Sequence, residues 1–317
     1  EDSIIAGGWD GSLKMWNGDG DILWSAQCED RIEAIIRIGE LVVVTSGLHI
    51  TCVKSGEILW SNALEGSADL LAFYDNKVIA TSSVYDIEHG DFMESALWQF
   101  SLDGELIEVT RMDERPWFLH SNENLILALG RPKCGLLVDG EHRELPSTSP
   151  VMCGLSGREN ILFGHADGTI SSFKGEEICK ESTSIESITC IEQGFVAALD
   201  NGDLVARTPS SDKIWTASGP QVTTHVAGFD DMHWCGRWDS IRGHLEVRSS
   251  SGELMVSTET SRPRVSDCSE NRIAFGFEDG QILVWERDLF QRRSNQEKSE
   301  ENSRNSALAA RLRSLRK

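Results

Sequence analysis

The sequence predicts an all-β protein: a β-propeller, in which four-stranded sheets, or blades, follow one another around a ring. Three observations support this prediction. A pattern of about 36–40 residues recurs along most of the chain, and such a period is typical of folds built from one small sheet per repeat. Each copy contains two tight-turn signals, which leaves room for four short strands. Tryptophan also recurs at two fixed positions of the pattern.

The first turn signal is an Asp-Gly or Asn-Gly pair between two apolar runs. It occurs at Asp10-Gly11, Asp167-Gly168, Asn201-Gly202 and Asp279-Gly280. Such pairs are the strongest short-range signal for a β-hairpin, because both turn residues adopt positive φ. We therefore assign the flanking runs to the second and third strands of each blade, strands b and c.

The second turn signal is a glycine followed by a short apolar run, as in Gly20-Asp21-Ile22-Leu23-Trp24 and Gly56-Glu57-Ile58-Leu59-Trp60. We place it between strands c and d. Equivalent turns recur at positions 20, 56, 104, 140, 175, about 212 and 252, so the intervals are 36, 48, 36, 35, about 37 and 40 residues. The long interval reflects an insertion in the b–c turn of the third copy.

The remaining apolar runs complete each blade. Strand a is expected at 31–38, 68–75, 115–121, 150–155, 185–191, 223–229 and 262–268, and strand b begins near 4, 41, 77, 125, 161, 195, 232 and 272. These strands give eight blades, of which the first lacks strand a and the last lacks strand d. We expect roughly 10–20 residues upstream of Glu1 to supply the first strand a, and they could supply the last strand d. A seven-bladed ring without the weakly patterned unit 125–145 is the alternative.

Two motifs resemble known propeller repeats. The apolar-Gly-x-x-Asp-Gly-x-Leu-x-x-Trp pattern at 4–16 resembles WD40 repeats, and Gly-Glu-Ile-Leu-Trp at 56–60 is similar to the repeat of quinoprotein-like (PQQ-like) propellers. The resemblance covers residues 1–288 and implies a propeller fold. It implies no particular function, because these folds carry many unrelated tasks. Gly164-His165 and Trp9-Asp10 do not stand at the family positions, so no buried His–Asp network is expected.

Six of the ten tryptophans occupy repeat positions. Trp16, Trp98 and Trp285 fall in strand c, and Trp24, Trp60 and Trp215 fall in strand d. An indole buries a large apolar area. We therefore expect these side chains to fill the space between neighbouring blades.

Composition narrows the possible partners and compartments. With 30 Lys+Arg against 51 Asp+Glu the formal net charge is −21, which argues against nucleic acid as the main partner, since phosphate binding depends on cations. No apolar run is long enough to predict a membrane span. The eight cysteines form no C-x-x-C pair, which predicts free thiols in the cytoplasm. The sequence begins with Glu1 rather than methionine. We therefore expect the true N-terminus to lie upstream, and a removed signal peptide would lie there too.

Lengthened loops concentrate on the predicted face that carries the b–c turns and the d–a connections. Loops carry binding functions when a rigid scaffold presents them, and aromatic and arginine side chains dominate protein interfaces. We predict that a protein partner docks on this face. The candidate contacts are Tyr85, Asp86, Glu88, His89, Phe92, Arg131, Lys133, Arg237, Trp238 and Arg242.

The end of the chain has a different composition. Residues 289–317 hold eight Lys+Arg and three Glu, and we predict a polar linker over 289–305 and a basic amphipathic helix over 306–317. The candidate recognition residues of this helix are Leu308, Arg311, Leu312, Leu315 and Arg316. We expect the helix to dock in a partner's groove. Folding back onto the acidic ring is one alternative, and contact with nucleic acid or an anionic membrane is the other.

These features predict a non-catalytic protein–protein interaction scaffold whose propeller loops and C-terminal helix each contact partners. The sequence has no phosphate-loop, Gly-x-Ser-x-Gly or His-Glu-x-x-His motif, so we assign no catalytic or metal-binding residue and expect no cofactor. The alternative is a small-molecule-binding or enzymatic propeller with a site at the axial channel.

Overall fold

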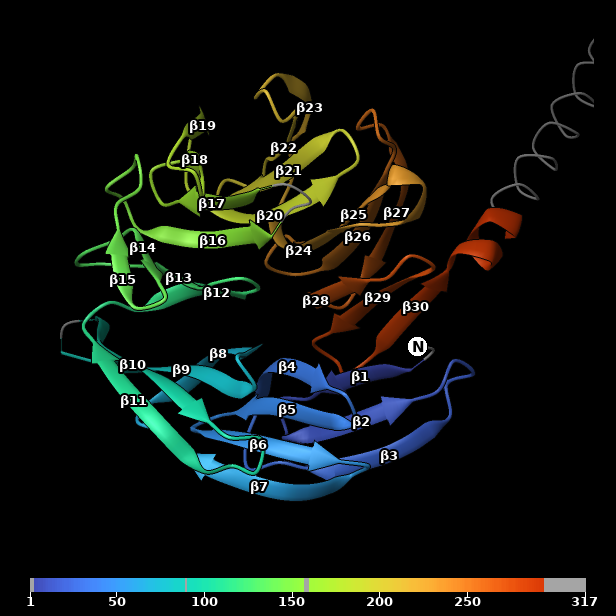
Figure 1. Ribbon diagram of the computed structural model, residues 1–317. Helices are drawn as coiled ribbons and strands as arrows, with labels where there is room; N and C mark the ends of the chain where they lie inside the picture. Colours follow the sequence, from blue (N-terminus) through green and yellow to red (C-terminus); the bar gives the residue numbers. More distant parts are fainter. Residues whose placement is uncertain (1–2, 89, 157–159, 294–317) are drawn as a thin grey trace, which may run out of the picture.

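The computed structural model describes residues 3–88, 90–156 and 160–293. In this part of the chain eight antiparallel sheets follow one another around a ring (Figure 1). The protein is therefore an eight-bladed β-propeller, as the repeat predicts. Residues 125–145 contribute to a complete blade of their own, so the seven-bladed alternative is wrong.

Six blades have four strands each in sequence order. The second to fourth blades are β4 (Ile32–Ile38), β5 (Leu41–Ser46), β6 (His49–Lys54), β7 (Glu57–Ala63); β8 (Ser67–Tyr74), β9 (Lys77–Asp86), β10 (Asp91–Phe100), β11 (Leu106–Met112); and β12 (Pro116–Ser121), β13 (Leu125–Leu129), β14 (Leu136–Val138), β15 (Glu141–Arg143). The fifth to seventh are β16 (Val151–Ser156), β17 (Ile161–His165), β18 (Thr169–Ser172), β19 (Glu177–Lys180); β20 (Ile185–Ile191), β21 (Gly194–Leu199), β22 (Leu204–Arg207), β23 (Lys213–Ala217); and β24 (Gln221–Ala227), β25 (His233–Trp238), β26 (Gly243–Arg248), β27 (Leu254–Thr260). A short 3₁₀ turn, η1 (Phe229–Asp231), joins β24 to β25.

The first and last blades have three strands each among the described residues. They are β1 (Ile4–Gly7), β2 (Ser12–Trp16), β3 (Ile22–Gln27) and β28 (Pro263–Cys268), β29 (Arg272–Phe277), β30 (Ile282–Glu286). The first blade begins at strand b and the last ends at strand c, in agreement with the sequence pattern.

The hydrophobic core lies between the blades. One apolar cluster joins Val43 and Cys52 of the second blade to Val78 and Trp98 of the third, and similar clusters follow around the ring. Because a blade with a packed neighbour on each side is covered on both faces, its second strand can be apolar at successive positions, as in Leu125–Leu129, all of which is buried.

Tryptophans of strand d pack on a glycine of the next blade. The indole Nε1 of Trp60 donates to the carbonyl of Leu102 at 2.9 Å, and that of Trp215 donates to the carbonyl of Ser250 at 3.1 Å. A Cβ atom on Gly104 or Gly252 would lie 2.5 Å from the indole Cγ. Five of the six repeat tryptophans join the inter-blade clusters, which confirms their expected role: Trp24, Trp60, Trp98, Trp215 and Trp285.

The chain after β30 differs from the predicted linker. Residues 287–293 are helical, and Phe290 places its ring 5.5 Å from that of Phe229 and 5.4 Å from that of Trp234. The Arg287 guanidinium is 2.7 Å from the Asp230 carboxylate. Two aromatic contacts and one ion pair thus hold a helix against the seventh blade, where the polar sequence predicted a linker from 289. None of the helices described is long and apolar enough to cross a membrane. The predicted helix 306–317, with Leu308, Arg311, Leu312, Leu315 and Arg316, lies outside the described residues.

Candidate functional site

Alternation of strand direction gives the ring two faces. The b–c face carries the d–a connections and the b–c turns, at 8–11, 47–48, 87–88 with 90, 130–135, 166–168, 200–203, 239–242 and 278–281. The a–b face carries the c–d turns and the a–b turns, of which the described ones are 39–40, 75–76, 122–124, 192–193, 228–232 and 269–271.

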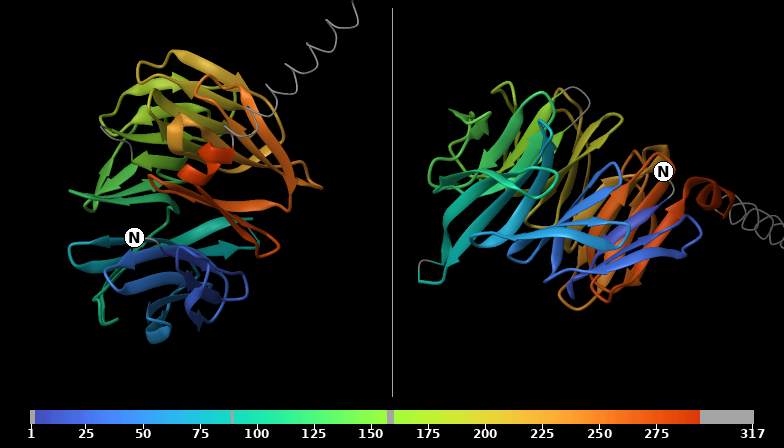
Figure 2. Two further views of the ribbon diagram at one scale, coloured as in Figure 1. Left: turned by 90° about the vertical axis from the view of Figure 1, so that its right-hand side faces the viewer. Right: turned by 60° about the horizontal axis from the view of Figure 1, so that its bottom comes forward.

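The longest hairpin of the b–c face is formed by β9 and β10. Each strand has ten residues, and pairing continues to Asp86 and Asp91, with a register shift between Phe92 and Glu94. Its tip projects from the ring in the right-hand view of Figure 2. This hairpin is the sequence insertion of the third copy, and it exposes 52% of Tyr85.

An aromatic cluster surrounds one arginine near the tip of this hairpin. The Arg115 guanidinium carbon lies 3.7 Å from the ring centre of Phe92 and 4.3 Å from that of Trp117. Tyr85 meets Phe92 edge-on, with ring centres 5.1 Å apart. We name Tyr85, Phe92, Arg115 and Trp117 the hairpin cluster. A cation that contacts the faces of two aromatic rings gives a surface that combines apolar groups with a positive charge.

Arg115 is fixed from below by a buried carboxylate. Its Nη2 is 2.8 Å from Asp69 Oδ1, and the Asp69 side chain is only 8% exposed. The Ser83 hydroxyl also donates to Asp69. Burial raises the pKa of Asp69, while hydrogen bonding by Ser83 and the charge of Arg115 oppose that shift. The carboxylate and the two rings together leave the guanidinium little freedom, so the cluster is preorganised for binding.

Several predicted contacts lie around the hairpin cluster. Arg131 and Lys133 are exposed in the turn 130–135, which packs against Trp117, because a Cβ on Gly130 would lie 2.8 Å from the indole nitrogen. Glu88 is exposed and Asp86 half-buried on the hairpin, and His89 lies outside the described residues. Arg115 and Trp117 were not among the predicted contacts. Their sequence signal is the run Arg115-Pro116-Trp117, in which an arginine precedes the proline that begins strand a.

A second group of tryptophan and arginine side chains lies on the same face. Arg262 stacks on Trp238 at 5.3 Å, and Arg264 stacks on Trp9 at 4.7 Å. Trp9 is 66% exposed. We name Trp9, Trp238, Arg262 and Arg264 the second cluster. Trp238 was a predicted contact, whereas the other three were not.

The two clusters occupy equivalent places in the ring. Arg115 precedes Pro116, which begins the first strand of the fourth blade, and Arg262 precedes Pro263, which begins the first strand of the eighth. Four blades separate them, which is half of an eight-bladed ring. The b–c face therefore offers two aromatic and cationic surfaces on opposite sides of its centre. The predicted contact Arg242 is exposed in the turn 239–242, which follows Trp238, and its guanidinium is 2.7 Å from Glu259.

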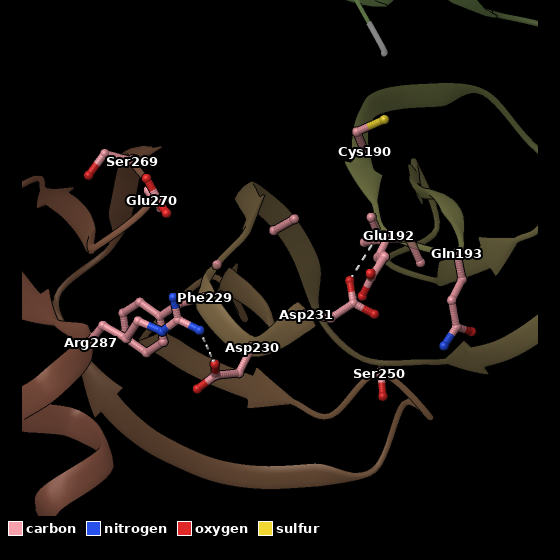
Figure 3. A pocket seen from close by; sticks show the side chains of 13 residues that line it. Cys190, Glu192, Gln193, Phe229, Asp230, Asp231, Ser250, Ser269, Glu270 and Arg287 are labelled. Atoms are coloured by element: carbon pink, nitrogen blue, oxygen red, sulfur yellow. Dashed lines mark hydrogen bonds and ion pairs between the residues drawn. The ribbon is translucent and has the colours of Figure 1, made fainter. Parts of the chain in front are cut away.

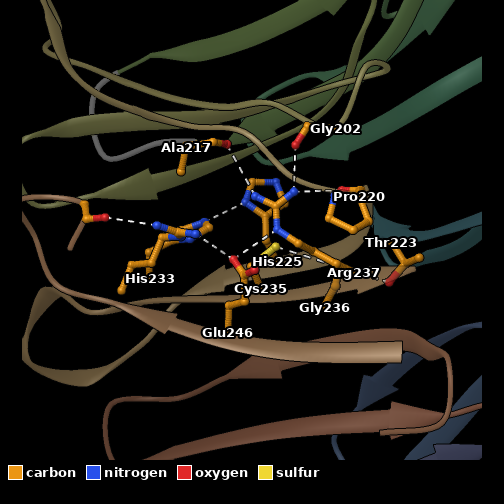
Figure 4. Close-up of polar contacts among 12 residues, drawn as sticks. Gly202, Ala217, Pro220, Thr223, His225, His233, Cys235, Gly236, Arg237 and Glu246 are labelled. Atoms are coloured by element: carbon orange, nitrogen blue, oxygen red, sulfur yellow. Dashed lines mark hydrogen bonds and ion pairs between the residues drawn. The ribbon is translucent and has the colours of Figure 1, made fainter. Parts of the chain in front are cut away.

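The prediction that Arg237 lies on the binding face is wrong. Its side chain is 0% exposed, so it cannot reach a partner. Nη1 donates to the carbonyls of Gly202 at 2.6 Å and Pro220 at 2.7 Å, and Nε donates to Glu246 at 3.0 Å (Figure 4). The sequence pattern put Arg237 in a lengthened turn, but β25 continues through Trp238, and the side chain points into the junction of the sixth and seventh blades.

Two buried histidines adjoin this junction. Nδ1 of His225 and Nε2 of His233 are 2.9 Å apart (Figure 4). Burial lowers the pKa of His225 to about 4. Burial, His225 and the nearby Arg237 and Arg248 hold the pKa of His233 well below its usual range. Both rings are therefore neutral in the folded protein at neutral pH.

We expect the protein to lose stability as the pH falls below about 6.5. The unfolded chain binds protons there that the folded chain does not, so the stabilisation is complete above 6.5 and decreases as the pH falls toward 4. His225 alone accounts for about 2 kcal/mol by pH 5, and His233 adds to this loss. Urea unfolding at pH 7.5, 6.0 and 5.0 measures the slope. The double variant His225→Leu, His233→Leu should have a flatter slope, and equal slopes would contradict the assignment.

The a–b face contains a cavity of about 750 Å³ between the sixth, seventh and eighth blades (Figure 3). Its charged lining residues are Glu192, Asp230, Asp231, Glu270 and Arg287. Asp230 and Asp231 both adopt positive φ, at 58° and 52°. Hydrogen bonds from Gln291 and Arg287 lower the pKa of Asp230. In the described part of the chain no group of three or more His, Cys, Asp or Glu side chains is arranged to hold a metal ion.

Comparisons with known proteins bear on the fold. No protein-family model matches the chain, and no curated protein matches it in sequence. Its structure is similar to that of the computationally designed Ika8 protein, with a TM-score of 0.71 and 16% identity over 90% of this chain and 93% of that one. BamB from Moraxella catarrhalis gives a TM-score of 0.73 and 15% identity over 90% and 94%. Sqt1 from Saccharomyces cerevisiae gives 0.68 and 12% over 90% and 92%. These three proteins share the fold of this chain. At such low sequence identities the structural similarity indicates no particular function.

Proposed function

We propose that this protein is a non-catalytic scaffold that binds a protein partner on its b–c face. The observation that carries the proposal is the hairpin cluster, which combines exposed Tyr85 and Trp117 with the fixed cation of Arg115. Tyrosine, tryptophan and arginine are the side chains that dominate binding energy at protein interfaces. The second cluster extends the same chemistry across the face, and the basic segment 306–317 would supply a further contact.

One similar structure gives this proposal independent support. BBS1N was solved in complex with ARL6DN, and it matches this chain with a TM-score of 0.56 and 8% identity over 79% of this chain and 90% of that one. A fold of this kind can thus present a binding surface to another protein. For the location we propose the cytoplasm, because the eight cysteines are free. Fractionation of native cells tests that part directly.

The experiment is affinity capture from the native cell extract with the full-length chain, followed by measurement of the dissociation constant for the captured protein. The double variant Tyr85→Ala, Trp117→Ala should weaken binding at least about 30-fold, which corresponds to about 2 kcal/mol lost at a hot spot. The matched control is Ile58→Ala, Ile107→Ala, which removes two similarly exposed apolar side chains from outer strands.

The outcomes separate the proposed function from its alternatives. Binding that survives in the hairpin variant but falls in the control would move the interface to the outer strands. Equal binding by all three proteins would overturn the choice of the b–c face. Capture of no protein at all would favour the alternative of a small-molecule-binding or enzymatic propeller with a site at the axial channel.

A further inference from the structure

The cavity on the a–b face has an excess of negative charge. Four carboxylates line it, from Glu192, Asp230, Asp231 and Glu270, against one cation, Arg287. Arg287 and Gln291 each approach an oxygen of Asp230 at 2.7 Å. One oxygen of Asp231 accepts a hydrogen bond from the backbone of Glu192 at 2.9 Å. Among the described residues no cation pairs with Glu192, Asp231 or Glu270.

This arrangement suits an arginine side chain. Carboxylates that face one concave surface reinforce each other's field and attract cations. A guanidinium group can donate to two carboxylate oxygens at once, which makes its pairing both stronger and more directional than that of a neutral donor. A volume of about 750 Å³ also lies within the roughly 300–1,000 Å³ of typical ligand pockets. Gln193, Ser250 and Ser269 add polar groups to the same lining.

The chain itself supplies such a segment next to the cavity. Arg287 lines the cavity and begins the helix 287–293, which Phe290 holds against the seventh blade. The 24 residues that follow Arg293 include six Lys or Arg and three Glu, and four of those cations fall within 306–317. Twelve residues, 294–305, separate the helix from this basic segment. A flexible chain of that length spans about 20 Å, so the segment can reach the cavity, at an effective concentration in the millimolar range.

We propose that residues 306–317 bind in the cavity of the a–b face, where the basic side chains of this segment pair with the carboxylates of Glu192, Asp231 and Glu270. This site lies on the face opposite the proposed partner surface, and its occupant is the protein's own tail. A tail bound there is not available to a partner, so a partner of the tail must compete with the cavity.

Hydrogen–deuterium exchange of the full-length protein tests the proposal. Amides of 306–317 should exchange at least tenfold more slowly in the wild type than in the triple variant Glu192→Gln, Asp231→Asn, Glu270→Gln. The matched control is Glu57→Gln, Asp103→Asn, Glu105→Gln, which removes the same charge from exposed positions at the c–d turns of the second and third blades. The control should retain the slow exchange. In the wild type, 0.5 M salt should abolish it, because exposed ion pairs are screened.

Three results would overturn the proposal. Exchange of 306–317 at the rate of an unstructured peptide in the wild type would mean that the tail is not bound. Equal loss of protection in both triple variants would mean that the tail responds to the overall acidity of the ring. The third result is a tail that binds in the cavity of another copy of the chain, which carbodiimide cross-linking of a mixture of ¹⁵N-labelled and unlabelled chains detects. Cross-links between Lys317 and the cavity that join labelled to unlabelled chains would assign the site to a second copy.

Discussion

Replacement of Arg237 by methionine is expected to lower the free energy of unfolding by about 3–5 kcal/mol, as is typical when one partner of a buried ion pair is removed. Methionine fills similar space but cannot donate to the carbonyls of Gly202 and Pro220, which would then be buried without this donor. Glu246 would keep its ion pair with Arg248, at 2.9 Å, but would lose the one with Arg237. Chemical denaturation at neutral pH, followed by tryptophan fluorescence, measures the change.

Arg242→Met is the control for this substitution. Arg242 also pairs with a glutamate, at 2.7 Å, but both side chains are well exposed. Exposed pairs contribute little, so the expected change is below about 1 kcal/mol. Equal destabilisation by the two variants would show that burial of Arg237 does not determine its contribution.

Gly252→Ala is expected to destabilise the protein by about 2–4 kcal/mol. The residue has φ +83°, and its new Cβ would lie 2.5 Å from the indole of Trp215. Backbone strain in the left-handed region costs about 1 kcal/mol, and overpacking adds about 1–3 kcal/mol. Thermal and denaturant unfolding both measure this loss, and the fluorescence of Trp215 should change with it.

The same substitution at Gly140 separates the two contributions. Gly140 also ends a c–d turn, with φ +88°, but no atom lies within 4 Å of its Cβ position. Gly140→Ala should therefore cost only the strain, about 1 kcal/mol. If both alanine variants lost the same stability, the tryptophan–glycine contact would contribute nothing.

The sequence predicts most of the fold because its information is local. Turn pairs such as Asp279-Gly280 and the alternation beside them locate the strands, so β5, β9 and β13 begin at the expected residues 41, 77 and 125. The helix at 287–293 is not predictable in this way, because it depends on Phe290 meeting Phe229 and Trp234 across about 60 residues of sequence.

The binding features are less visible in the sequence, since they arise where distant segments meet. Arg115 becomes part of a cluster only when the hairpin brings Phe92 beside it. The cavity combines Glu192, Asp231 and Glu270, which come from a–b turns of three blades. The prediction for Arg237 was wrong for a different reason: β25 continues to Trp238 instead of turning at Gly236, so the side chain of Arg237 points into the interior.

The tryptophan–glycine contacts are unevenly distributed around the ring. Among the described residues they join the first blade to the second, the second to the third and the sixth to the seventh, through Gly56, Gly104 and Gly252. At the other junctions between described residues no indole packs on the turn glycine, and both Gly20 and Gly140 have nothing within 4 Å of their Cβ positions. The described ring is therefore reinforced in this way at three junctions. A load that pulls blades apart would be resisted most where an indole packs on the next blade, so the scaffold would flex first between blades that lack this contact.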